Sequence, residues 1–165
     1  GDYYIFDFQY YLDRGITTPD LITIALSTND INLQRDQYDY DDRMEFMKLA
    51  LRRMVTSIKA AAPSAEIAVI PAPISAASTT GYTRWQAENT NWIYECQLIC
   101  EELSVDFVPV YLHVPRDYSN PWSSNTPVAN TMMNRAHVTD WVHFDEYGRD
   151  MYCNATTAWA VNRIT

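Results

Sequence analysis

The sequence lacks several features that mark common classes of protein. It has no apolar run near the roughly 18 residues that a membrane-spanning helix needs, so no transmembrane segment is predicted. No signal-peptide pattern begins at Gly1. Basic residues are few: the chain has 12 Lys and Arg but 21 Asp and Glu, which gives a net charge of -9. Phosphate backbones and anionic membrane surfaces would repel such a chain, so we expect neither nucleic acid nor membrane as a partner.

Cysteines are also few, and they are not arranged in pairs. The three are Cys96, Cys100 and Cys153, which do not form the pattern of a disulfide framework. Cys96 and Cys100 are four apart in a helical pattern and are expected to pack as small apolar groups. No further ligands at short spacing accompany them, so no metal site is predicted. Repeats and linkers are absent too, and residues 1–165 are expected to form a single domain.

The chain alternates between short apolar runs and amphipathic stretches. Leu21 to Leu26 is almost continuously apolar, which is typical of a strand covered on both faces. We predict strands at 21–26, 67–70 and 105–111. We predict helices at 6–12, 41–62, 84–103 and 145–163, with an irregular stretch at 114–138. This alternation predicts an α/β fold with a parallel sheet and helices on both faces.

Polar residues with catalytic potential follow the first strand and precede the last helix. Ligand sites of parallel sheets lie beyond the carboxyl ends of the strands, where Asn29 and Asp30 occur. The amide of Asn29 could bind a developing oxyanion, or Asn29 could simply form a turn. His143 could act as a general base with Asp140 orienting its ring, or the two could be a surface histidine beside a helix-capping aspartate.

Together these motifs resemble the SGNH, or GDSL-type, hydrolases. Ser27-Thr28-Asn29-Asp30 is similar to the family's Gly-x-Asn-Asp, and Asp140-Trp141-Val142-His143 is similar to its Asp-x-x-His. The resemblance implies a flavodoxin-like, three-layer α/β/α sandwich with a parallel sheet. It also implies a serine-type ester hydrolase without metal or cofactor, acting on acetyl or other small acyl groups, often on carbohydrate. His143 would be the base, Asp140 its orienting acid, and Asn29 an oxyanion donor.

The sequence departs from the family pattern at the nucleophile. Ser27 replaces a glycine, and neither the Gly-Asp-Ser block nor the glycine block of the oxyanion hole occurs. Gly1-Asp2-Tyr3 is rejected because no strand precedes it and its third residue is tyrosine. No serine lies in a Gly-x-Ser-x-Gly elbow. We therefore expect the N-terminal strand or strands, with the nucleophile, to be missing from this chain and to complete the sheet at the exposed edge of strand 21–26.

A second interpretation stays open. A non-catalytic carbohydrate-binding or structural module of a cell-surface or viral-fibre assembly would suit a lost nucleophile, and fold alone does not decide function. An extracellular, virion or cell-surface location is favoured. Aromatic residues on predicted loops could stack on sugars or simply pack the loops. The acidic run from Asp36 to Asp42 lacks the central glycine of a calcium loop and is expected to be a solvated helix start.

Overall fold

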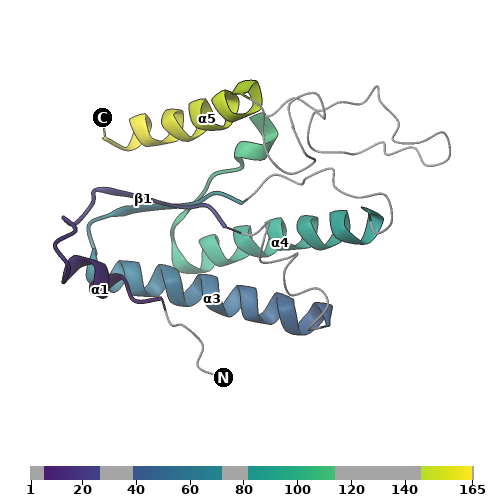
Figure 1. Ribbon diagram of the computed structural model, residues 1–165, viewed down its shortest axis with the longest axis horizontal. Helices are drawn as coiled ribbons and strands as arrows, with labels where there is room; N and C mark the ends of the chain where they lie inside the picture. Colours follow the sequence, from purple (N-terminus) through teal and green to yellow (C-terminus); the bar gives the residue numbers. More distant parts are fainter. Residues whose placement is uncertain (1–5, 27–38, 72–81, 114–145, 165) are drawn as a thin grey trace. The chain divides into compact units, whose positions relative to one another are not determined.

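The computed structural model describes residues 6–26, 39–71, 82–113 and 146–164. Helices and strands alternate along the chain, as Figure 1 shows. Contacts divide the chain into two compact units. The first comprises Gly1–Ile70 and Trp92–Phe107, and the second comprises Pro71–Asn91 and Val108–Thr165.

The first unit contains a parallel sheet of three strands in the order β1-β2-β3. The strands are β1 (Leu21–Ile24), β2 (Glu66–Val69) and β3 (Asp106–Phe107). Ile22 lies opposite Ile67, and Val69 lies opposite Phe107. Residues 67–70 are all buried, because β2 has a neighbouring strand on each side. The predicted parallel sheet is confirmed.

Helix α3 (Tyr40–Ala61) forms as its apolar periodicity predicts. The Asp39 carboxylate caps its first turn by accepting a hydrogen bond from the Asp42 N–H at 3.0 Å. Asp41 and Asp42 lie in the first turn and Lys59 in the last, which suits the helix dipole. The buried stripe contains the apolar side chains Met44, Met47, Leu51, Val55 and Ile58. Residues 39–42 are therefore a helix start, as expected.

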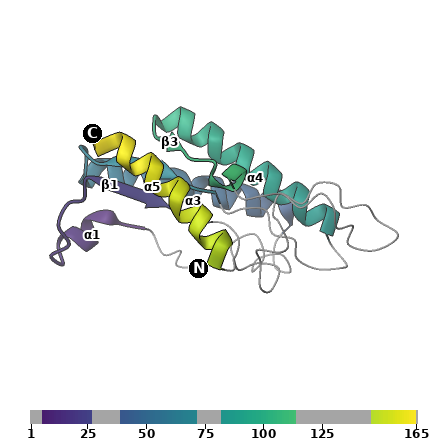
Figure 2. The same ribbon diagram turned by 90° about the horizontal axis from the view of Figure 1, so that it is seen from above.

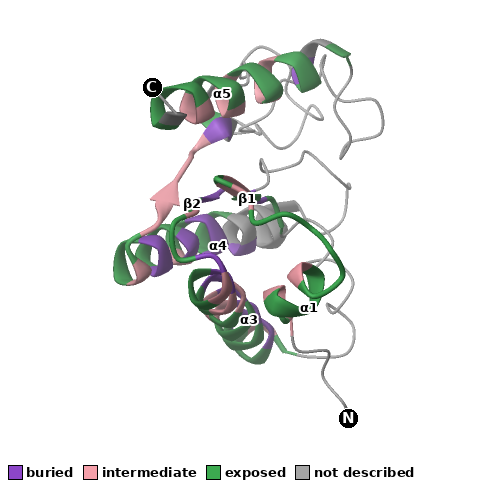
Figure 3. Ribbon diagram, turned by 90° about the vertical axis from the view of Figure 1, so that its left-hand side faces the viewer, coloured by how far each residue is buried: buried purple, intermediate pink, exposed green. Residues whose placement is uncertain are grey.

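Helix α4 spans Tyr82–Leu103, and its C-terminal half belongs to the first unit. Figure 3 shows this half and α3 on one face of the sheet. Arg52 of α3 donates from Nε and Nη2 to the carboxylate of Glu102, with a shortest distance of 2.8 Å. This hydrogen bond holds the pKa of Glu102 below its usual value. The Lys59 ammonium also donates to the Leu103 carbonyl at 2.6 Å. These contacts fix the two helices against each other at their outer surface.

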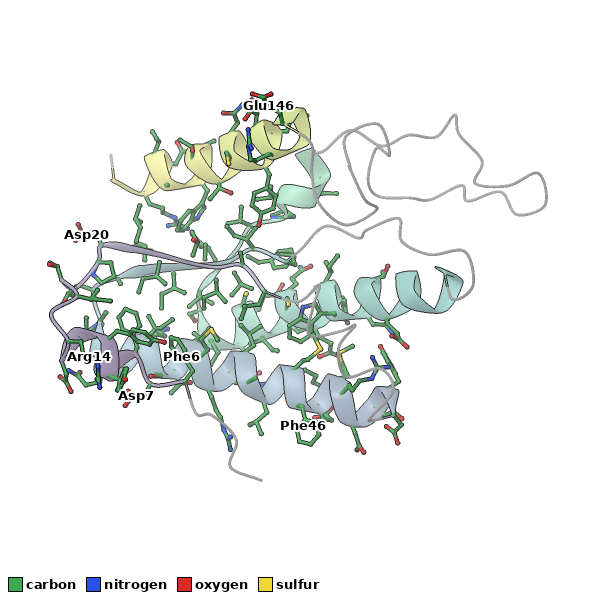
Figure 4. The ribbon with its side chains drawn as sticks, viewed as in Figure 1. Phe6, Asp7, Arg14, Asp20, Phe46 and Glu146 are labelled. Atoms are coloured by element: carbon green, nitrogen blue, oxygen red, sulfur yellow. The ribbon has the colours of Figure 1, made fainter. Side chains whose placement is uncertain are left out.

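Helix α1 (Phe8–Leu12) is short and aromatic, as predicted. The Asp7 carboxylate caps it, and the Phe8 N–H donates to Ser57 Oγ of α3 at 2.9 Å. Gly15 has a φ of 88°, a left-handed conformation that favours glycine and lets the chain turn towards β1. Figure 4 shows Phe6, Asp7 and Arg14 around this helix.

The third predicted strand is wrong beyond Phe107. The chain instead forms a 3-10 helix, η1 (Val110–His113). Pro109 has no N–H to donate to a sheet, and the Val110 N–H donates back to the Val108 carbonyl at 2.8 Å. The turn therefore follows directly from the proline.

The second unit contains η1 and the last helix, α5 (Glu146–Ile164), which contact each other. Burial raises the pKa of Tyr152 on α5 to about 12. Of the helices in the described ranges, none is both long and apolar enough to cross a membrane.

The three cysteines should differ in reactivity. Cys96 and Cys100 are buried on α4, whereas Cys153 is exposed. Burial raises the pKa of the Cys100 thiol to about 12 and also raises that of Cys96, so neither is a thiolate at pH 8. We expect iodoacetamide to modify only Cys153 in the folded protein and all three thiols in guanidinium, as measured by intact mass spectrometry. Equal alkylation of Cys96, Cys100 and Cys153 without denaturant would contradict this burial.

Candidate active site

The carboxyl ends of β1, β2 and β3 meet at one edge of the sheet, because the three strands are parallel. Pairing continues past the strands themselves, since the Ile70 N–H donates to the Ile24 carbonyl at 2.8 Å. Ile70 and Pro71 are buried where the chain leaves β2, whereas Leu26 is exposed where it leaves β1. In parallel sheets this edge is where ligands bind.

Asn29 follows this edge closely in the sequence. The described residues that follow β1 end at Leu26, which is three residues before Asn29. The chain is described again at Asp39, which caps α3. Because α3 leads back to the start of β2, its first turn lies towards the carboxyl edge. Residues 27–38 lie outside the described residues, so the role of Asn29 stays a prediction.

Asp140 and His143 also lie outside the described residues. Their segment, 114–145, is flanked by η1 and α5, and these two elements contact each other. His143 precedes the first residue of α5, Glu146, by three positions. The segment therefore leaves and rejoins the described chain at neighbouring elements. That His143 lies close to Asp140 and Asn29 stays a prediction.

Two buried charged residues were not predicted from the sequence. Arg43 is buried in the first turns of α3, where its Nε donates to the Asp39 carbonyl at 3.3 Å and its guanidinium lies over the Tyr40 ring at 5.9 Å. Glu88 is buried in the N-terminal half of α4. Each occupies a position on the apolar stripe of its helix, four residues before Met47 and Trp92 respectively. A charge on such a stripe is the signal that could have identified them.

The described serines lie away from the carboxyl edge. Ser64 and Ser104 lie in the turns just before β2 and β3, at the opposite edge of the sheet. Ser57, near the C-terminal end of α3, accepts the hydrogen bond from the Phe8 N–H. None of these three is placed to act as a nucleophile at the predicted site. The other serines lie outside the described residues.

Metal ligands do not gather in the described ranges, where no group of three or more His, Cys, Asp or Glu could hold a metal ion. The assignment of catalytic roles to Asn29, Asp140 and His143 stays a prediction, because all three lie outside the described residues.

Similar proteins indicate the fold. The structure is similar to an acetyl-xylooligosaccharide esterase variant from Geobacillus, with a TM-score of 0.56 and 19% identity over 86% of this chain and 59% of that chain. It is also similar to a GDSL-like lipase from Bacteroides thetaiotaomicron, with a TM-score of 0.57 and 18% identity over 89% of this chain and 64% of that chain. This chain thus spans about three fifths of these proteins. No curated protein sequence matches it.

These similarities and the parallel sheet confirm the predicted fold class, the three-layer α/β/α sandwich of the SGNH hydrolases. A sequence profile of the GDSL-like lipase/acylhydrolase family matches residues 7–150, a range that includes Asn29, Asp140 and His143. The chain therefore belongs to the GDSL-like lipase/acylhydrolase family.

Proposed function

We propose that this chain is part of a serine-type ester hydrolase that removes acetyl or other small acyl groups from carbohydrate. The observation that carries the proposal is the family match over residues 7–150, which includes both motifs. The parallel sheet supports it, because Asn29 follows a strand at the edge where such sheets bind ligands. The similarity to an acetyl-xylooligosaccharide esterase favours acetyl groups on sugars.

The placement of the catalytic residues is supported by the acetylxylan esterase from Geobacillus stearothermophilus. Its variants described as catalytic mutants carry alanine in place of a serine, an aspartate and a histidine. The aspartate and histidine are three positions apart, as Asp140 and His143 are here. More residues separate its serine from its aspartate than precede Asp140 in this chain. The same spacing would place the nucleophile upstream of Gly1.

The proposed reaction has two steps. The serine oxygen attacks the ester carbonyl carbon while His143 takes the hydroxyl proton, and Asp140 holds the other ring nitrogen and stabilises the imidazolium. The side-chain N–H of Asn29 donates to the oxyanion of the tetrahedral intermediate. His143 then gives its proton to the departing sugar hydroxyl, which leaves an acyl-serine. A water molecule then attacks this ester while His143 takes its proton. His143 returns that proton to the departing serine oxygen, which releases the acid and the free serine.

The proposed enzyme also needs a structural partner. A segment upstream of Gly1 would supply the nucleophile strand and complete the sheet beside β1. The incomplete burial of Leu21 and Ile22 in β1 and the exposure of Leu26 after it support this arrangement, since an uncovered hydrophobic edge strand is prone to aggregate.

Replacing Asn29 by alanine in the full-length protein tests the proposal. We expect kcat for p-nitrophenyl acetate and for acetylated xylooligosaccharides to fall by about 10²- to 10³-fold with little change in KM, because the amide acts on the transition state. Asn162→Ala, at an exposed position near the end of α5, is the matched control and should leave kcat unchanged. Full activity of the Asn29 variant would reject its role. No turnover of any acetyl ester by the intact protein, with glycan binding retained, would favour the non-catalytic module.

A further inference from the structure

A buried positive charge lies where α3 begins, and the proposed reaction does not use it. Arg43 is 2% exposed and occupies the apolar stripe of α3, four residues before Met47. Burial of a guanidinium is unfavourable, and the N-terminal end of a helix dipole repels a cation. An apolar side chain would fit this stripe without either effect. A charge retained against both effects indicates that Arg43 holds a particular partner.

The direction of Arg43 follows from the helix repeat. Ser57 is 14 residues further along α3, close to four full turns, so both side chains leave the helix on nearly the same side. Ser57 Oγ accepts from the Phe8 N–H of α1, so Arg43 faces the α1 side of α3. Arg52 is two and a half turns beyond Arg43, faces the opposite way and pairs with Glu102 of α4. Arg43 therefore points away from the C-terminal half of α4.

On that side of α3, the sheet ends where the chain leaves β1. Figures 2 and 3 show α1 and α3 on the same face of the sheet, with α1 on the side of β1 that is away from β2. The first turn of α3 lies towards the carboxyl edge, where β1 ends. Arg43 therefore faces the point at which the chain passes from Leu26 into residues 27–38.

A buried guanidinium is stable beside a carboxylate that is buried with it. The carboxylates that the structure describes at the ends of α1 and at the start of α3 are all exposed; they belong to Asp7, Asp13, Asp39, Asp41 and Asp42. They are therefore poor partners for the buried charge of Arg43.

The connection 27–38 contains two further carboxylates, Asp30 and Asp36. Asp36 belongs to the polar run 34–37, which is typical of a solvent-exposed chain, whereas an apolar residue follows Asp30. Asp30 is four residues after Leu26, so their Cα atoms are at most about 14 Å apart. Asp30 is thus tied to the end of β1 that Arg43 faces.

We propose that Arg43 is a positioning residue of the oxyanion hole, and that its guanidinium pairs with the carboxylate of Asp30 beneath the turn that bears Asn29. The inference rests on the proposed function for the role of Asn29. Asp30 lies outside the described residues, so the experiments are chosen to detect the pair itself. Because Asn29 and Asp30 are adjacent, holding Asp30 restricts the Asn29 amide before the substrate arrives. Donors fixed in advance are the ones that stabilise an oxyanion effectively.

A cycle of variants in the full-length protein tests the role in catalysis. We expect Arg43→Met and Asp30→Asn each to lower kcat for p-nitrophenyl acetate about 100-fold, because a displacement of about 1 Å at a catalytic group has that effect. The double variant should also lose about 100-fold, rather than the roughly 10⁴-fold expected of independent residues. KM should change by less than about 3-fold. A loss of about 10⁴-fold in the double variant, or a change in KM alone, would overturn the proposal.

Matched variants show whether the effect belongs to this pair. Arg53→Met alters an exposed arginine of the same helix, and Asp36→Asn alters the other carboxylate of the connection. Each should leave kcat within about 2-fold of the wild type. Arg43→Lys keeps the positive charge and should be about 10-fold more active than Arg43→Met. Equal activity of the Lys and Met variants, or coupling of Arg43 to Asp36 in place of Asp30, would overturn the proposal.

Thermal unfolding of the same variants detects the pair without enzymatic turnover. Loss of one partner leaves the other charge buried and unpaired, so Arg43→Met and Asp30→Asn should each lower Tm by about 10 °C. The double variant should recover most of this loss, because no unpaired charge is left on the apolar stripe. Recovery of a folded protein by the second change would support the pair even where Arg43→Met alone does not fold. A double variant less stable than both single variants, or recovery by Glu88→Gln in place of Asp30→Asn, would overturn the proposal.

The outcome is separable from that of the proposed function. Recovery of Tm in the double variant, in a full-length protein that hydrolyses no acetyl ester, would reject only the function. Wild-type kcat in Arg43→Met, with Tm losses that add in the double variant, would reject only the pairing.

Discussion

Replacing His143 by alanine in the full-length protein is expected to lower kcat/KM for acetyl esters by about 10⁴-fold or more. Without the imidazole, the serine hydroxyl has no base to accept its proton, and the leaving alcohol has no acid to protonate it. The loss is measured by steady-state hydrolysis of p-nitrophenyl acetate. Circular dichroism of the same sample shows whether the variant is folded.

The chain offers matched controls for this variant. His113 and His137 are its other two histidines, and alanine at either should cost less than about 10-fold if only His143 is the base. Asp140→Asn should lower kcat by about 10⁴-fold through loss of the correct ring tautomer. The double variant Asp140→Asn/His143→Ala should be little worse than His143→Ala, because the two residues act as one unit. An equal loss for His137→Ala would contradict the assignment of the base.

Replacing Ile99 by alanine is expected to destabilise the protein by about 3 kcal/mol. Ile99 of α4 is 0% exposed, so the truncation removes buried methyl groups and leaves a cavity. The adjacent Leu98 is 39% exposed, and Leu98→Ala should change stability by about 0.5 kcal/mol or less. Urea denaturation followed by tryptophan fluorescence measures both. An equal loss of stability in the two variants would contradict the assignment of Ile99 to the buried face of α4 and of Leu98 to its exposed face.

The sequence predicts helices well where apolar spacing is regular. The stripe from Met44 to Ile58 identified α3 almost to the residue, because its burial follows the 3.6-residue repeat. Arg43 was missed on that stripe because periodicity counts apolar residues only. The strand at β3 was predicted too long, since the apolar run continues through Pro109 but the hydrogen bonds do not. Short runs carry no periodicity that could show where pairing ends.

The burial of β1 could not be read from its sequence. The run from Leu21 to Leu26 predicts a strand covered on both faces, but in the structure only Ile24 is buried. Burial of a strand depends on its neighbours in the sheet, which local sequence does not specify. The predicted site residues present a related difficulty. Asn29, Asp140 and His143 lie in connections, where no repeat fixes the direction of a side chain, and only the family match links them.

The central claim is that this chain holds the base of a serine esterase whose nucleophile lies upstream. The most direct test is to label the full-length protein with a fluorophosphonate and to locate the adduct by peptide mass spectrometry. A fluorophosphonate forms a covalent adduct with a serine that a neighbouring base activates. We expect one adduct per chain, on a serine upstream of Gly1 that follows an apolar strand, and much slower labelling of the His143→Ala variant. An adduct on a serine within residues 1–165, or continued ester turnover with no adduct at all, would contradict this claim.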